Sequence, residues 1–385
     1  MNSSTACSKS WTDINIDFKN RKLGHCCKSV YYDLPDEYSP DFIDNSKLIQ
    51  ERRKQTLQGI KHHDCIECWQ DIAKGQKSYI HLWNEWKDFT TVKPDVPKVN
   101  TVEIHLDHTC DLSCLYCYAG SSSKIAQEEG VVIDDKTRDY DIENVKLWIK
   151  KFVETTDDEL LICFSGGEPT SSKFFYSLIE FINTLDTSKI TIDVITNGNS
   201  KPFLFKKFIK LIDDFKGSVH ISISNESYKE DSELIRYGLD WDRFVNNVCA
   251  YAEHSNVQHI NLSISVSNIG LPTFYDYVIW AYNTLIEYDI TFVMCGAMIT
   301  TPKELDVAIL PPSCKKYIKP ALEFFSQIPY SDDFYDNEEF LLYLKSLEER
   351  IGSNYQENYK EIIGNYLAEK ERVKKTNTLM KLTNI

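Results

Sequence analysis

Six short segments between residues 101 and 296 are rich in apolar and β-branched residues, a pattern that predicts β-strands. The stretches between them, such as "ENVKLWIKKFVETT" and "KFFYSLIEFINTL", are amphipathic and predict helices. The predicted strands cover residues 101–107, 160–164, 190–196, 218–224, 259–266 and 290–296. Regular alternation of strands and helices favours a parallel sheet covered by helices, an α/β fold. We expect these units to form a partial (β/α)6 barrel, with functional loops at the carboxyl ends of the strands.

The pattern differs on either side of this region. Residues 13–18 alternate polar and apolar side chains, which predicts a half-buried strand that continues into a hairpin. A helix is expected over residues 46–60, and the two prolines in 91–100 indicate a linker. Residues after 300 have mainly helical periodicity. We therefore predict a small α+β module (1–98), an α/β core (99–300) and a helical C-terminal segment (301–385).

Composition narrows the functional classes. The chain carries 43 basic and 58 acidic residues, a formal charge of −15, which disfavours nucleic acid as the main partner because phosphate binding needs a basic face. No apolar run is long enough to span a bilayer, and the N-terminus lacks the apolar core of a secretory signal. We expect a cytoplasmic protein.

Twelve cysteines are many for a reducing compartment, where disulfides do not persist. Four of them stand singly among apolar or helical residues, and we expect these to be small buried hydrophobes. The four are Cys163, Cys249, Cys295 and Cys314. The other eight lie in the first third of the chain, where metal binding is the favoured interpretation.

The segment "HTCDLSCLYCYAG" (108–120) holds Cys110, Cys114 and Cys117 directly after the first strand of the core. Iron–sulfur clusters are normally held by four cysteines, so three leave one iron open to a substrate or cofactor. A structural zinc site would require a fourth ligand, for which His108 is a candidate, although it is crowded beside Cys110.

The Cys-x3-Cys-x2-Cys spacing, with Tyr116 before the last cysteine, resembles the signature of radical S-adenosylmethionine (radical SAM) enzymes. The resemblance implies that the three cysteines hold a [4Fe–4S] cluster and that SAM chelates its fourth iron. It also implies that Tyr116 lies near the adenine. Reductive cleavage of SAM would then give a 5′-deoxyadenosyl radical that abstracts hydrogen from a substrate.

Three further segments extend this resemblance. "FSGGEPT" (164–170) follows the second strand of the core, and the family pattern implies that Gly166, Gly167 and Glu168 bind the amino end of SAM. The third strand ends at "ITNGN", which includes Asn197. The fourth carries Ser222 and Ser224, where family members bind the ribose and carboxylate of SAM.

The N-terminal cysteines resemble those of a twitch domain, a shortened relative of the SPASM domain that carries an auxiliary iron–sulfur cluster. The resemblance rests on a cysteine with a Trp four residues later, a hairpin, a Cys-Cys pair, a helix and then CxxC. It implies a probable auxiliary [4Fe–4S] cluster with ligands Cys7, Cys26, Cys65 and Cys68, Cys27 being a rival to Cys26. A structural zinc site with four cysteine ligands is the alternative.

Relatives of this kind often modify peptides or proteins, or perform oxidations in which the auxiliary cluster accepts an electron. The resemblance implies an oxidoreductase, a peptide-modifying enzyme or an epimerase, and leaves the exact reaction open. The resemblance therefore implies a peptide or protein substrate, with a small molecule next, and a reductant such as flavodoxin or ferredoxin. The alternative function, in a different class from the enzymes, is a non-catalytic scaffold stabilised by zinc or iron–sulfur sites.

Overall fold

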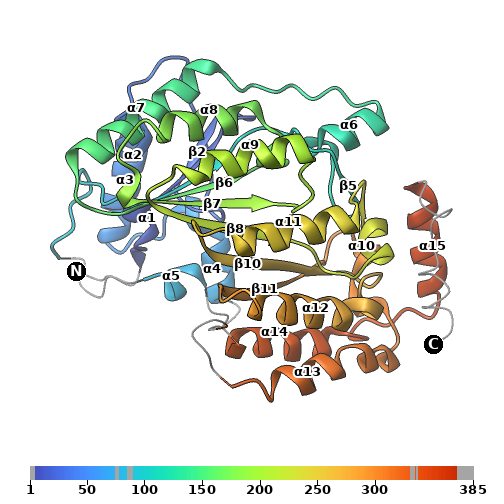
Figure 1. Ribbon diagram of the computed structural model, residues 1–385. Helices are drawn as coiled ribbons and strands as arrows, with labels where there is room; N and C mark the ends of the chain where they lie inside the picture. Colours follow the sequence, from blue (N-terminus) through green and yellow to red (C-terminus); the bar gives the residue numbers. More distant parts are fainter. Residues whose placement is uncertain (1–4, 74–77, 85–89, 330–333, 335–336, 371–385) are drawn as a thin grey trace. The chain divides into compact units, whose positions relative to one another are not determined.

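The computed structural model describes residues 5–73, 78–84, 90–329, 334 and 337–370. These residues form two compact units, and Figure 1 colours the chain along its length. Unit 1 comprises Met1–His108, Asp134–Asp193 and Leu211–Ser218, and unit 2 comprises Thr109–Ile133, Val194–Lys210 and Val219–Ile385. The two units are each made of several segments of the chain, whereas the predicted domains are continuous. The domain limits predicted at residues 98 and 300 therefore stay a prediction.

The sheet of unit 1 begins with the predicted hairpin. β1 (Asp13–Asp17) pairs antiparallel with β2 (Lys22–Gly24), which pairs in turn with the short β3 (Tyr32–Asp33). On its other side β1 runs parallel to β4 (Thr101–His105), and β4 runs parallel to β6 (Leu160–Ser165). The N-terminal hairpin therefore extends the same sheet as the first two strands of the predicted core.

Helices of unit 1 form where local capping and apolar spacing agree. α3 (Lys47–Leu57) starts after Ser46, whose hydroxyl accepts a hydrogen bond from the Ile49 amide at 3.3 Å, as an N-cap does. α7 (Asp139–Thr155) and α8 (Lys173–Ile182) lie side by side in Figure 1. The remaining helical segments are α1 (Lys9–Thr12), α2 (Phe42–Asn45), η2 (His63–Cys65), α4 (Ile66–Ala73), α5 (Tyr79–Leu82), η4 (Pro169–Ser171) and η5 (Thr187–Lys189).

The chain passes from unit 1 into unit 2 within β7 (Ile190–Thr196). In unit 2, β8 (Ser218–Ser224), β10 (Val257–Val266) and β11 (Thr291–Met298) are parallel neighbours. These strands agree with the predicted segments to within two residues, and the sheet pairs of both units confirm an α/β fold with mostly parallel strands. Closure into a partial barrel stays a prediction.

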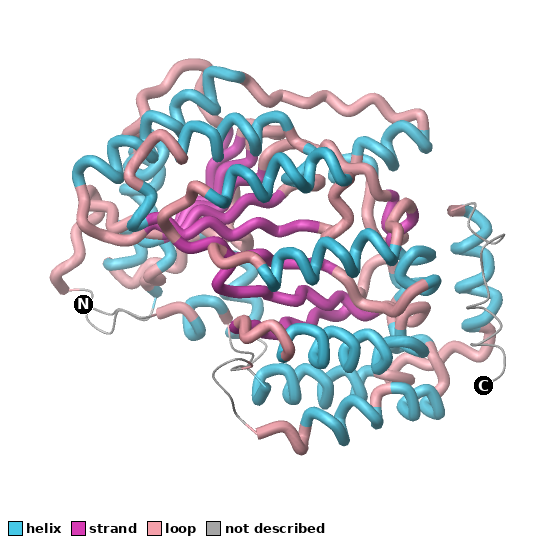
Figure 2. Tube along the Cα trace, in the orientation of Figure 1, coloured by secondary structure: helices cyan, strands magenta, loops and turns pink. Residues whose placement is uncertain are grey.

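Helices predominate after residue 300, as predicted. In Figure 2, α12 (Phe274–Ile286), α13 (Lys319–Phe325) and α14 (Asn337–Arg350) lie beside one another, and α14 also packs on β11. The other elements that lie wholly or mostly in unit 2 are β5 (Ser113–Cys114), η3 (Ala119–Ser121), α6 (Ser123–Glu129), α9 (Pro202–Asp213), α10 (Glu230–Ile235), β9 (Arg236–Tyr237), α11 (Trp241–Glu253), η6 (Leu271–Thr273), η7 (Lys303–Leu305), η8 (Val307–Ile309), η9 (Pro312–Tyr317) and α15 (Tyr359–Glu369). Within the described ranges no helix has both the length and the apolar character that a bilayer span requires.

Candidate active site

The loop with the three core cysteines is anchored by apolar side chains while its thiols stay accessible. Leu112 and Leu115 are each 1 % exposed, whereas Cys110, Cys114 and Cys117 are half-buried. A thiol that served only as a small hydrophobe would lie on the buried side with the leucines. Alternation of buried leucines and accessible cysteines therefore suits metal binding.

Backbone pairing fixes the middle of this loop. β5 and β9 pair antiparallel, which sets Cys114 opposite Arg236. The Leu115 amide donates to the Ile235 carbonyl at 2.8 Å, and the Tyr366 hydroxyl of α15 donates to the Leu115 carbonyl. A cavity of about 510 Å³ adjoins the loop at Cys114, with Glu128 in its wall.

A buried ion pair lies behind the loop. Glu226 is fully buried and accepts hydrogen bonds from Nε and Nη2 of Arg236 at 2.9 and 2.8 Å. The Tyr116 hydroxyl donates to the same carboxylate at 3.1 Å, and the Arg236 guanidinium lies 5.7 Å from the centre of the Tyr116 ring. Burial raises the pKa of Glu226, and the adjacent Arg236 lowers it in opposition. The hydroxyl end of Tyr116 is thus engaged in the protein interior, and its adenine-binding role stays a prediction.

The predicted Gly-Gly-Glu turn belongs to unit 1, where it packs on the end of β4. Gly166 has φ +131°, and a Cβ there would lie 2.9 Å from the Asp107 carbonyl oxygen. The Gly167 amide donates to that same oxygen at 2.9 Å. Only glycine adopts this backbone at such a close approach. Glu168 is 2 % exposed and is the N-cap of η4, because its Oε1 accepts from the amide and hydroxyl of Thr170.

The predicted strand ends lie in unit 2. Asn197 follows β7 directly and accepts from the Asn199 amide at 2.8 Å. Ser222 is buried on β8 and its hydroxyl accepts from Asn261 Nδ2 at 3.3 Å, while Ser224 is half-buried at the last position of β8. Their roles toward SAM stay predictions.

A polar face runs across the strands of unit 2, and of its residues the sequence-based predictions assigned a binding role to Ser224 alone. Ser224, Ser263 and Cys295 are direct neighbours on β8, β10 and β11. Cys295 is exposed, so its expected place in the core is wrong. Cys163 and Cys249 are half-buried, and Cys314 alone among the four single cysteines is buried as expected.

Unit 1 has an equivalent polar row. Asn15, Glu103 and Cys163 are neighbours on β1, β4 and β6, and the Asn15 amide group donates to Glu103. The signal was present in the sequence, because polar residues occupy every second position of segments such as "TVEIHLD" and "HINLSISV". Strands with one polar face supply functional groups as well as a core.

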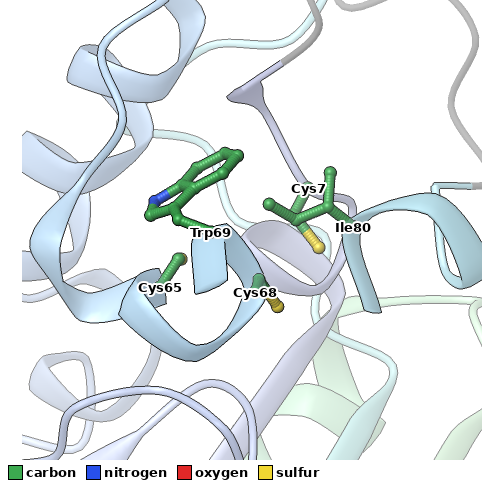
Figure 3. Close-up of a cluster of buried hydrophobic side chains, with 5 residues drawn as sticks. All are labelled: Cys7, Cys65, Cys68, Trp69 and Ile80. Atoms are coloured by element: carbon green, nitrogen blue, oxygen red, sulfur yellow. The ribbon is translucent and has the colours of Figure 1, made fainter. Parts of the chain in front are cut away.

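The N-terminal cysteines gather from distant segments of unit 1. Cys7 precedes α1, Cys65 ends η2 and Cys68 lies on α4, and the three are buried in one cluster with Trp69 and Ile80. Figure 3 shows these five side chains together. Burial raises the pKa of Cys7 to about 12 and that of Cys65 to about 11. Thiols in this setting hold their protons until a metal replaces them.

Cys26 and Cys27 complete the N-terminal set. Cys26 is 8 % exposed, comparable to the other three predicted ligands, whereas Cys27 is exposed. A shared hydrogen bond is the main reason why the pKa of Cys26 is raised and that of Cys27 is lowered to about 6. Cys26 thus matches the other predicted ligands in burial more closely than Cys27 does, and the choice between the two stays a prediction.

A buried arginine beside the N-terminal cysteines also fits an anionic centre. Arg52 is 0 % exposed, and its Nη1 lies 3.4 Å from Asp64 Oδ2. Within the described part of the chain, its Nε and Nη2 have no hydrogen-bond partner. Burial lowers the pKa of Arg52, and negative charge on Cys65 opposes this most strongly. Two unused donors near a metal-binding thiol suit a sulfur-rich anion.

Comparisons with known proteins agree with the loop chemistry. Residues 106–272 match the family model described as the radical SAM superfamily. The radical SAM cyclopropyl synthase TigE of Paramaledivibacter caminithermalis is 23% identical over 207 residues, which are 46% of this chain and 43% of that protein. The chain thus spans less than half the length of this curated relative.

Solved structures give partial likenesses. A His-tagged anSMEcpe with bound AdoMet covers 59% of this chain and 60% of its own, at 19% identity and a TM-score of 0.41. The match with Streptococcus suis SuiB covers 84% of this chain and 70% of the SuiB chain, at 12% identity and a TM-score of 0.44. The half-buried three-cysteine loop, which lies in the matched segment, suits a protein that holds a metal cluster. Residues 106–272, which include this loop, are thus similar to the radical SAM superfamily.

Proposed function

We propose that this chain is a radical SAM enzyme. Cys110, Cys114 and Cys117 would hold a [4Fe–4S] cluster with one iron left to SAM. The chemistry that such a cluster would supply, once reduced by one electron, is cleavage of bound SAM to methionine and a 5′-deoxyadenosyl radical, which would remove a hydrogen atom from substrate. The observation that carries the proposal is the set of three accessible thiols on an anchored loop inside the matched segment.

The protein's own contribution is to bind and orient. We assign SAM binding to Gly166, Gly167 and Glu168 and to Asn197, Ser222 and Ser224, on the strength of the sequence motifs. The buried carboxylate of Glu226 would hold the loop by way of Tyr116 and Arg236. The polar row of unit 2, formed by Ser224, Ser263 and Cys295, would bind the substrate and restrain its reacting C–H bond.

The N-terminal cysteines would hold a second cluster. Cys7, Cys26, Cys65 and Cys68 are its proposed ligands, which keeps the twitch-like assignment as a proposal. Shared burial of the four thiols and the unused donors of Arg52 support an anionic metal centre there, and the resemblance to twitch domains favours iron–sulfur over zinc.

We propose a peptide or protein as substrate, with a small molecule as the second candidate, and flavodoxin or ferredoxin as electron donor. A cytoplasmic place agrees with twelve cysteines that form no disulfide. A non-catalytic zinc or iron–sulfur scaffold is the alternative function.

One assay separates the enzyme from the scaffold. Anaerobically reconstituted protein is incubated with SAM and dithionite, and 5′-deoxyadenosine is measured. We expect slow formation by the wild type and none by the C110A/C114A/C117A variant. A scaffold would give no 5′-deoxyadenosine in either case, and equal yields from both proteins would refute the assignment of the three ligands.

A further inference from the structure

Two adjacent buried arginines of α3 differ in how their donors are used. Arg53 is 1 % exposed, and its guanidinium donates to backbone carbonyls at Ser10 (2.7 Å), Asp44 (3.0 Å) and Pro94 (3.3 Å). Arg52 is equally buried, yet it has one long contact to Asp64 and two nitrogens without a hydrogen-bond partner in the described structure. Buried guanidinium donors are normally satisfied, so Arg52 requires an explanation that Arg53 does not.

The residues around Arg52 hold its side chain in place but do not satisfy all of its hydrogen-bond donors. Asp64 is fully buried, and besides Arg52 its carboxylate accepts from the Tyr32 hydroxyl. Asp64 directly precedes Cys65, so the arginine is fixed beside a predicted cluster ligand. Cys65 is also the strongest negative influence on Arg52. An acceptor at the cysteine cluster would complete the hydrogen bonding of this side chain.

We propose that Arg52 is a positioning residue of the N-terminal iron–sulfur cluster, donating N–H groups to its sulfur atoms and raising its reduction potential. The inference rests on the N-terminal cluster proposed above. A [4Fe–4S] centre with four thiolates carries a net charge of −2 when oxidised and −3 after accepting one electron. A fixed cation with N–H donors stabilises the more negative state, and hydrogen bonds to sulfur are among the determinants of cluster potential. Arg52 thus makes the cluster a better electron acceptor.

The test isolates this cluster in full-length protein. The C110A/C114A/C117A background leaves the N-terminal site as the remaining cluster, and its potential is measured by dithionite titration followed by electron paramagnetic resonance. We expect Arg52→Gln to disfavour reduction at least tenfold, a shift of about 59 mV to lower potential for one electron. Arg52→Lys keeps the positive charge but loses the planar set of guanidinium N–H donors. Its reduction potential should therefore lie between those of the background protein and Arg52→Gln. Arg53→Gln is the matched control, and we expect it to move the potential by less than half as much.

The possible outcomes distinguish failure of the N-terminal cluster proposal from failure of the role proposed for Arg52. A background protein that binds no iron would refute the N-terminal cluster itself. A cluster whose potential is unchanged in Arg52→Gln, or changed equally in Arg53→Gln, would refute only the role of Arg52.

A second measurement requires no substitution of Arg52. In the background protein labelled with ¹⁵N-arginine, pulsed electron paramagnetic resonance of the reduced cluster should detect coupling to an arginine nitrogen. Absence of that coupling would overturn the inference.

Discussion

Arg236 and Glu226 form a buried ion pair, with Arg236 Nη2 2.8 Å from Glu226 Oε2, at the point where β9 pairs with the cysteine loop. Glu226 is 0 % exposed and Arg236 5 %. Such a pair adds little net stability compared with apolar residues, but removal of one partner leaves a buried charge without compensation. The arrangement therefore ties the integrity of the cysteine loop to two residues that are not ligands.

Replacement of Arg236 by Met should destabilise the protein by about 3–5 kcal/mol, because Glu226 then remains buried and unpaired. Urea denaturation measures the loss. Iron retention should fall as well, since Arg236 is paired with Cys114 across the short β5–β9 ladder. In E226Q/R236M the cost should be smaller than in the single variant, because no unpaired charge is left.

The control for this pair is an exposed ion pair in unit 1. Lys189 Nζ lies 2.7 Å from Asp157 Oδ1, and the Asp157 side chain is fully exposed. Solvent screens such pairs, so Asp157→Asn should leave the urea midpoint nearly unchanged. An equal loss in D157N and R236M would contradict the importance of burial.

Gly166→Ala should destabilise the protein by about 1–3 kcal/mol, because an alanine would hold a strained φ and approach the Asp107 carbonyl. Gly364 on α15 is the matched control, since a Cβ there meets nothing within 4 Å. Gly364→Ala should stabilise by about 0.5–1 kcal/mol through helix propensity. Thermal unfolding of the two variants should thus shift in opposite directions, and a shift in the same direction would refute the argument.

The strands of the core were predictable because each is a short run of β-branched residues between turn signals. β7 and β8 begin and end where the sequence predicts. The cysteine loop was predictable too, since ligand spacing along a chain is read directly from the sequence. The spacing of residues along the chain does not depend on tertiary structure, so such local patterns can be interpreted from the sequence alone.

What depended on long-range pairing was not predictable. The parallel pairing of β1 with β4 joins residues almost ninety positions apart, and no local pattern specifies it. Glu226 and Arg236 read as ordinary surface charges until β9 is paired with β5. Arg52 likewise looks like a solvated helix residue, and only the packing of α3 against the cysteine segments reveals its burial.

Acid should weaken the fold through His259. Burial is the main reason that its pKa is lowered to about 4 from an ordinary value of 6.5, and the nearby His220 contributes. Because the folded state binds fewer protons than the unfolded state between these values, this contribution to stability is present above pH 6.5 and is lost as pH falls toward 4. His259→Asn should show a smaller decrease in melting temperature between pH 7 and 4.5 than wild type. Identical decreases would refute this role of His259.

Removal of two N-terminal ligands should separate the two proposed clusters. In C65A/C68A, iron and sulfide content after anaerobic reconstitution should fall by about half, because four cysteines are needed to hold the N-terminal cluster and three to hold the other. Slow 5′-deoxyadenosine formation should persist, since Cys110, Cys114 and Cys117 are unchanged. The C110A/C114A/C117A variant is the reciprocal control, with the same loss of iron but no 5′-deoxyadenosine. Iron content equal to wild type in C65A/C68A would refute the N-terminal cluster, and zinc in its place would favour a structural metal site.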